Sequence, residues 1–186
     1  MNKKYKKKKL FMIIGSNSFS GGSFINELLN RNYNVIGVSR SPEKKELNPY
    51  LKNENIKNFK FYRIDLNKNL KKINDLINSY KPKYIINFAA QGMVNESWIY
   101  PEDWYQTNLV SMTKLVKSIS KLKFIKIFLN FSTPEVYGNI SKLTDEKAFF
   151  NPTTPYAISR SAFDFHLLNL NKFYKFPVII TRTANV

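Results

Sequence analysis

The stretch LFMIIGSNSFSGG, residues 10–22, joins a run of apolar residues to a turn rich in glycine and serine. The run at 10–14 is short and continuous, which favours a buried strand. The residues after the turn, which include Phe24 and Leu28, follow helical spacing. A strand, a glycine-rich turn and a helix in this order predict the first βα unit of an α/β domain.

The rest of the chain repeats this alternation. Runs of apolar, β-branched or aromatic residues predict further strands at 34–38, 59–64, 84–88, 124–132 and 177–182. Segments with helical spacing lie between them, for example Leu70, Ile73, Leu76 and Ile77, then Leu109, Met112, Leu115, Val116 and Ile119. The alternation predicts an α/β fold, a doubly wound parallel sheet in a single domain. We expect this domain to span 10–186, after a basic tail at 1–9.

Composition excludes several classes of protein. A chain of 186 residues that is 43% hydrophobic can bury a core, so it is not a disordered protein. Cysteine is absent, which excludes disulfides and thiolate metal sites and fits a reducing compartment. The run at 10–14 is shorter than the roughly 7–15 apolar residues of a signal peptide, and no run approaches the ~20 of a membrane span. We expect a cytoplasmic protein without a membrane partner.

The formal net charge is +17, and six lysines lie between Lys3 and Lys9. A basic surface of this size could attract nucleic acid or anionic lipid. However, the basic residues form no single amphipathic stripe, and no nucleic-acid-binding motif accompanies them. Because lysine and asparagine are plentiful throughout the chain, we interpret the charge as general composition and expect no nucleic-acid partner.

The glycine-rich turn is a candidate cofactor site. Gly15 and Gly21 are six apart, as in turns whose glycines let the backbone and a helix N-terminus approach a pyrophosphate. Ser18 stands at the middle position, where glycine is usual. The alternative is a turn whose glycines serve close packing alone. The predicted phosphate-binding residues are Gly15, Ser18, Phe19, Ser20 and Gly21.

The end of the second predicted strand indicates which dinucleotide would bind. An NAD site normally has an acidic residue there for the ribose hydroxyls, whereas this chain has Ser39, Arg40 and Ser41. A guanidinium and two hydroxyls suit a 2′-phosphate, so we expect NADP, with NAD as the alternative. The default alternative for Arg40 is a solvated surface charge.

Two later segments bring acid–base groups together. NFSTPEVYG, residues 130–138, follows the fifth predicted strand, so Thr133 and Glu135 should project from the carboxyl end of the sheet, where open α/β folds bind ligands. PYAISR, residues 155–160, places Tyr156 and Arg160 on one helix face. No zinc motif or serine-hydrolase elbow is visible, and we expect no metal.

These motifs, in this order, give the chain a resemblance to extended short-chain dehydrogenases/reductases, within the NAD(P)-dependent nucleotide-sugar epimerase/dehydratase family. The motifs are the glycine-rich turn, NFAAQ after the fourth predicted strand, YQTNLV, STPEVYG, YAISR and the closing TRTANV. The resemblance implies a Rossmann-like fold, a nucleotide-sugar substrate and a homodimer. Family members continue for roughly another hundred residues that form most of the sugar pocket, so we expect a fragment lacking most of the C-terminal substrate domain.

The resemblance also implies roles for individual residues. It places Asp65 near adenine and Ala89 and Ala90 along the cofactor. The other residues that it adds to the cofactor site are Leu66, Gln91, Asn108, Tyr156 and Arg160. The substrate site that it implies comprises Ser132, Thr133 and, near the substrate diphosphate, Asn185.

The family chemistry needs a base for a sugar hydroxyl, and an ordinary tyrosine, with a pKa of about 10, needs a nearby cation to act as one at neutral pH. The family cation is a lysine four residues after Tyr156, where this chain has Arg160, which keeps the charge but changes the geometry. Family 4,6-dehydratases match Thr133 and Glu135, whereas Pro134 has no acidic group. We therefore expect a 4,6-dehydratase acting by transient oxidation at sugar C4, with Thr133, Glu135, Tyr156 and Arg160 catalytic.

Other interpretations remain open at this point. One is an epimerase working through the same keto intermediate, and another is a non-catalytic NADP-binding or sensor protein, which the departures at Ser18, Pro134 and Arg160 favour. Arg160 could be a surface helix residue, and Glu135 an ordinary exposed carboxylate at a strand end.

Overall fold

The computed structural model describes residues 8–141 and 143–183. Residues 1–7 of the expected basic tail and Asn185 of the expected substrate site lie outside the described residues. Six strands form one parallel sheet in the order β3-β2-β1-β4-β5-β6. The strands are β1 (Leu10–Ile14), β2 (Asn34–Ser39), β3 (Phe59–Arg63), β4 (Tyr84–Asn87), β5 (Ile127–Ser132) and β6 (Val178–Arg182).

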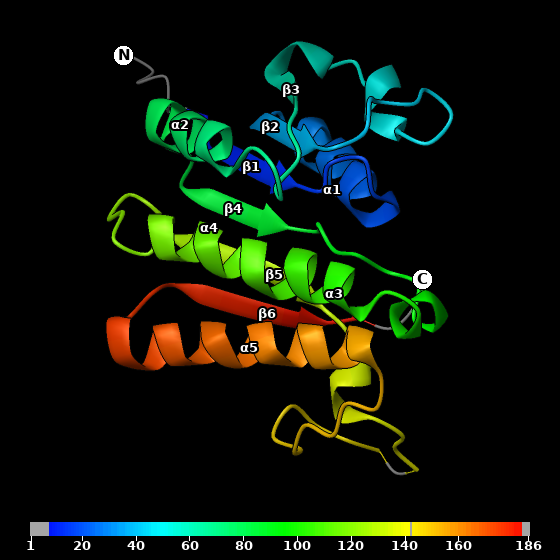
Figure 1. The fold of residues 1–186 in the computed structure, drawn as a ribbon. Coiled ribbons are helices and arrows are strands. Elements are labelled where there is room, and N and C mark those ends of the chain that lie inside the picture. The colour runs from blue at the N-terminus through cyan, green and yellow to red at the C-terminus, as the bar shows by residue number, and fades with distance from the viewer. Residues whose placement is uncertain (1–7, 142, 184–186) are drawn as a thin grey trace.

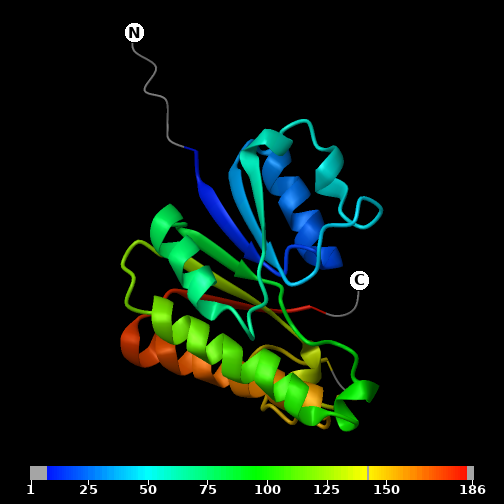
Figure 2. The same ribbon diagram turned by 45° about the horizontal axis from the view of Figure 1, so that its top comes forward.

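Helices cover both faces of the sheet, and each face has its own apolar core (Figures 1 and 2). On one face, α1 (Phe19–Asn30) packs with the short turns η1 (Pro49–Lys52) and η2 (Ile56–Asn58). The other face carries α2 (Leu70–Tyr80), α4 (Met112–Ile119) and α5 (Pro155–Tyr174). Met12 and Ile13, which are consecutive on β1, point to opposite cores because side chains alternate along a strand. The predicted doubly wound α/β domain is confirmed.

Strand β5 begins at Ile127, three residues later than the predicted run at 124–132. Ile125 is buried, but it lies in the turn that leads into the strand. The apolar residues at 124–126 predicted burial, but apolar character does not distinguish a turn that packs in the core from a strand that pairs in the sheet.

The helix that leads into α4 is not uniform. It starts as α3 (Pro101–Trp104), continues as the π-helical turn η4 (Tyr105–Ser111) and then becomes α4. Two further 3₁₀ turns are η3 (Asn95–Trp98) and η5 (Pro134–Tyr137). A π-helical turn inside a helix often accompanies a functional site. Among the described residues, no helix is both long and apolar enough to cross a membrane.

Candidate active site

A cavity of about 260 Å³ lies at the carboxyl ends of the central strands. It occupies the place where the strand order reverses between β1 and β4, which is where open α/β sheets bind ligands. The expected cofactor residues that line it are Gly15, Ser18, Ser39, Arg40, Ser41, Asp65, Leu66, Ala89, Ala90 and Gln91. Six other expected cofactor residues are not part of the lining, namely Phe19, Ser20, Gly21, Asn108, Tyr156 and Arg160.

The first turn is built so tightly that two of its glycines have no room for a side chain. Gly15 has a φ of +83°, and a Cβ there would lie 2.5 Å from the backbone nitrogen of Ala89. A Cβ on Gly21 would lie 2.4 Å from the carbonyl oxygen of Gly15. These glycines therefore let the turn pass close to β4 and α1, beside the cavity.

Ser18, which departs from the usual glycine, caps α1. Its hydroxyl donates to the carbonyl oxygen of Gly15 at 2.8 Å and accepts from the backbone N–H of Gly21 at 3.0 Å. Serine is among the best N-cap residues because its side chain supplies a partner for a first-turn N–H group. The serine thus stabilises the turn.

Replacing Gly15 by alanine is expected to lower the free energy of unfolding by about 2–5 kcal/mol. The left-handed conformation costs an ordinary residue roughly 1–2 kcal/mol, and the contact with Ala89 adds about 1–3 kcal/mol. Urea titration followed by circular dichroism measures the loss. Gly92→Ala is the control, because a Cβ at Gly92 meets nothing within 4 Å. Equal stability of the two variants would contradict the described turn.

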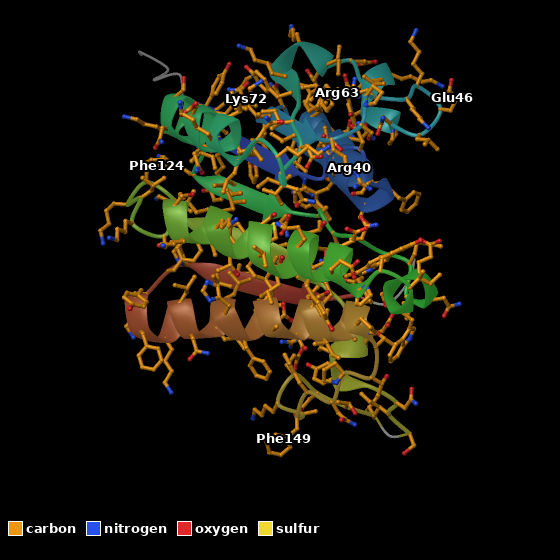
Figure 3. All side chains as sticks on the ribbon, viewed as in Figure 1. Arg40, Glu46, Arg63, Lys72, Phe124 and Phe149 are labelled. Atoms are coloured by element: carbon orange, nitrogen blue, oxygen red, sulfur yellow. The ribbon has the colours of Figure 1, made fainter. Side chains whose placement is uncertain are left out.

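The end of the cavity near β2 and β3 is rich in polar groups. Arg40 is exposed beside the carboxyl ends of the strands, and the Arg63 Nε donates to its carbonyl oxygen at 3.2 Å (Figure 3). Asn17, a lining residue that the sequence analysis missed, donates from its amide to the carbonyl oxygen of Ser41 at 2.8 Å. Its place inside the glycine-rich turn could have identified it.

The segment after β5 brings Thr133 and Glu135 together. Thr133 is buried, and its hydroxyl accepts from the backbone N–H of Glu135 at 3.3 Å, which starts η5. Glu135 is partly buried, and this burial raises the pKa of its carboxyl above the ordinary value. Glu135 is therefore not a fully exposed carboxylate, and its catalytic role stays a prediction.

Helix α5 starts beside this segment. The Thr154 hydroxyl caps it by accepting from the N–H of Ala157 at 3.1 Å, and the N–H of Tyr156 donates to the Ser97 hydroxyl at 3.2 Å. The first turn of α5 is thus fixed to η3, which holds the Tyr156 backbone in place.

Arg160 is buried, with 4% of its surface exposed, so the alternative that it is a surface helix residue is wrong. Its guanidinium donates to the carbonyl oxygen of Phe131 on β5. Burial lowers the pKa of Arg160, whereas the charges of Tyr156 and Asp164 favour its ionised form. Arg160 does not line the cavity, because its side chain points into the contact between α5 and β5.

Asn108 lies in the π-helical turn and connects the cavity to α5. Its Oδ1 accepts from the N–H of Gln91 at 2.7 Å, and its Nδ2 donates to the Gln91 carbonyl at 3.0 Å and to the Ser159 hydroxyl at 3.0 Å. Asn108 thus fixes a lining residue to the helix that carries Tyr156.

The sequence analysis also missed Asp164, which is fully buried on α5. Ser132, an expected substrate residue, donates its hydroxyl to this carboxylate at 2.8 Å. The spacing of four residues from Arg160 and eight from Tyr156 could have identified Asp164, because such residues share a helix face. Among the described residues, no cluster of histidine and acidic side chains could hold a metal ion.

Comparison with known proteins shows which family the chain belongs to. The family model described as GDP-mannose 4,6 dehydratase matches residues 12–186. A probable dTDP-glucose 4,6-dehydratase of Sinorhizobium fredii is 26% identical over 185 residues, which cover 94% of this chain and 52% of the relative. The human dTDP-D-glucose 4,6-dehydratase is 31% identical over 157 residues, covering 83% of this chain and 44% of that protein.

Solved structures share the fold. A UDP-glucose 4-epimerase from Brucella ovis, in complex with NAD, superposes with a TM-score of 0.82 at 20% identity, covering 95% of this chain and 52% of the other. The epimerase of Campylobacter jejuni gives a TM-score of 0.83 at 23% identity, covering 94% and 53%. The chain spans about half the length of the curated relatives that it matches.

Proposed function

The chain belongs to the GDP-mannose 4,6-dehydratase family, and from this premise we propose that it is part of a nucleotide-sugar 4,6-dehydratase that uses a nicotinamide dinucleotide. The observation that carries the proposal is the cavity at the strand ends, because residues expected to bind the cofactor form its lining. The family assignment and the position of Tyr156 on the neighbouring helix support the same conclusion.

The residues around the cavity fit a dinucleotide. Gly15 leaves room for close backbone approach, and the first N–H groups of α1, at Phe19 and Ser20, have no partner within the helix. A pyrophosphate would lie against these groups. Asp65 and Leu66 would contact the adenine, and Ala89, Ala90 and Gln91 would line the path towards the nicotinamide.

When bound, the dinucleotide would supply a hydride acceptor for C4 and later return the hydride to C6, so C4 is oxidised, C6 is reduced and the overall reaction has no net redox change. Tyr156 would take the proton of the sugar hydroxyl at C4, and Thr133 would hold that hydroxyl. Glu135 would remove the proton at C5 and pass it to the hydroxyl that leaves C6 as water. Arg160 would support the tyrosinate through its charge, and Asn185 would contact the substrate diphosphate.

The assignment is tested by incubating the chain with NADP⁺ or NAD⁺ and a panel of nucleotide sugars, and by following the products by NMR. A 4-keto-6-deoxy sugar supports the dehydratase. An epimer of the substrate, formed without loss of water, supports an epimerase instead. An epimerase would fit the lack of an acidic group at Pro134.

A second candidate is a non-catalytic dinucleotide-binding protein. The observation that favours it is the Arg160 guanidinium, which is buried against the Phe131 carbonyl and away from the cavity lining. Tight dinucleotide binding without turnover of any sugar in the panel would support this candidate.

NADP is the proposed cofactor because Arg40, which lines the cavity, forms no ion pair within the described part of the chain. Replacing Arg40 by glutamine is expected to weaken NADP⁺ binding about tenfold or more and to leave NAD⁺ binding unchanged. A hydrogen bond to a charged group contributes roughly 1.5–3 kcal/mol. Isothermal titration calorimetry measures both affinities, with Arg31→Gln, on the exposed end of α1, as the control. Tighter binding of NAD⁺ than NADP⁺ by the unmodified chain would refute the preference.

We further propose a cytoplasmic homodimer whose contact includes the outer face of α5. Helices α4 and α5 lie side by side on one face of the sheet (Figure 1). Apolar side chains on α5 are exposed there, among them Ile158, Phe165 and Leu168, with 41%, 50% and 45% of their surface accessible. Light scattering after gel filtration is expected to give twice the chain mass, and replacing Phe165 by lysine should give the monomer mass.

A further inference from the structure

Asp164 has no contact with water, and both oxygens of its carboxylate are engaged. The Asn130 amide donates to Oδ1 at 3.1 Å, and the Ser132 hydroxyl donates to Oδ2 at 2.8 Å. The Arg182 Nε lies 3.4 Å from the same Oδ2. A single carboxylate on α5 thus holds the ends of β5 and β6.

Arg160, one turn earlier on α5, donates a hydrogen bond to the carbonyl oxygen of Phe131, the residue before Ser132 on β5. Two oppositely charged residues of one helix therefore hold three consecutive residues of β5, namely Asn130, Phe131 and Ser132. Those residues directly precede Thr133, so their contacts with α5 determine the positions of Thr133 and Glu135.

The same network extends to the cavity. The Asn87 amide donates to the Asn130 Oδ1 at 2.9 Å, and its own Oδ1 accepts from the N–H of Ala89, which lines the cavity, at 3.1 Å. At the other end, Arg182 donates to the Tyr137 hydroxyl at 2.9 Å, at the end of η5. The network therefore connects the cofactor side of the site with the segment that carries Glu135.

Burial makes these charges costly unless they compensate one another. Desolvation lowers the pKa of Arg160 and raises the pKa of Asp164, while each charge favours the ionised form of the other. Arg182 also favours the ionised carboxylate.

We propose that Asp164 is a positioning residue, whose buried carboxylate, together with Arg160, fixes the end of β5 and thereby the placement of Thr133 and Glu135. The proposal rests on the proposed function, because it assigns a purpose to the placement of those two side chains. A misplacement of about 1 Å at such groups can lower a rate roughly a hundredfold, so rigid support is needed.

Hydrogen exchange measured by mass spectrometry tests this without requiring turnover. In Asp164→Asn, the amides at 131–137 are expected to exchange at least tenfold faster, while those of β1 keep their protection. Asp75→Asn, an exposed carboxylate on α2, is the control and should leave both segments unchanged. Unchanged exchange at 131–137, or an equal increase at β1, would overturn the proposal.

Ser132→Ala keeps the test decisive if Asp164→Asn does not fold, and a double variant adds a second test if it does fold. Ser132→Ala removes one contact of the carboxylate and keeps both charges, and it should also accelerate exchange at 131–137. No acceleration in this variant would overturn the proposal as well. In the double variant Arg160→Met/Asp164→Asn, the increase in the exchange rate at 131–137 should be smaller than the product of the increases in the two single variants, because both residues hold the same strand end. An increase equal to that product would contradict a shared role.

Turnover then separates this inference from the proposed function. If the whole enzyme of which this chain is proposed to be part converts no nucleotide sugar, the proposed function fails, while the exchange result still decides the role of Asp164 in holding β5. If it does convert one, Asp164→Asn should lower kcat at least thirtyfold and change the dinucleotide affinity less than threefold. A parallel loss of affinity and rate would indicate general destabilisation and contradict a positioning role.

Discussion

Replacing Tyr156 by phenylalanine is expected to lower the turnover of a nucleotide sugar about a thousandfold, because a positioned acid–base group contributes roughly 10²–10⁴ in rate. The substitution removes one hydroxyl and keeps the ring. The helix that carries the residue is fixed independently of that hydroxyl, by the Thr154 cap and by the contact between the Tyr156 N–H and Ser97. Fold and dinucleotide affinity should therefore remain close to those of the unmodified chain.

The comparison needs initial rates of product formation by NMR and dinucleotide affinities by calorimetry. Tyr174→Phe is a matched control, because Tyr174 lies at the other end of α5 with 75% of its surface exposed. Glu135→Gln tests the elimination step separately. If Tyr156→Phe keeps a third or more of the rate, another group is the base, and the assignment of Tyr156 is refuted.

Replacing Arg160 by methionine is expected to lower the free energy of unfolding by about 1–3 kcal/mol, the usual cost of leaving a buried hydrogen-bonding group without its partner. The change leaves the Phe131 carbonyl without its donor and weakens the compensation of the Asp164 charge. For a chain of this size the loss corresponds to a fall of roughly 2–12 °C in the unfolding midpoint.

Thermal unfolding followed by circular dichroism gives the midpoints. Arg31→Met is the control, because Arg31 pairs with Glu27 at the surface, with 65% of its side chain exposed, and such pairs contribute little. Arg160→Lys keeps the charge but lacks the planar fork, so its midpoint should lie between those of Arg160→Met and the unmodified chain. Equal midpoints for Arg160→Met and Arg31→Met would show that the buried contact does not stabilise the fold.

Arginine at this position therefore has a physical explanation that the sequence alone did not provide. Its long, forked side chain reaches the β5 backbone while its charge stays near Tyr156 and Asp164. The sequence analysis weighed a charge that supports the tyrosinate against a solvated surface charge. Burial excludes the second, and the support of a tyrosinate remains a prediction.

The order and type of the strands and helices followed from the sequence, because periodicity and turn residues are local properties. The run at 10–14 coincides with β1, and the glycine-rich turn leads into α1 as expected. Most expected cofactor residues line one cavity, because the carboxyl ends of parallel strands meet at one edge of the sheet.

The tertiary structure alone decided what the polar side chains contact. Ser18 caps a helix, Asn108 ties Gln91 to α5 from a π-helical turn, and Asp164 joins β5 and β6 beneath the site. The partners of Asn108 and Asp164 lie 17 to 51 and 18 to 34 residues away along the chain. No local pattern records such distant contacts, because they arise only when packing brings the elements together and burial makes each polar group require a partner.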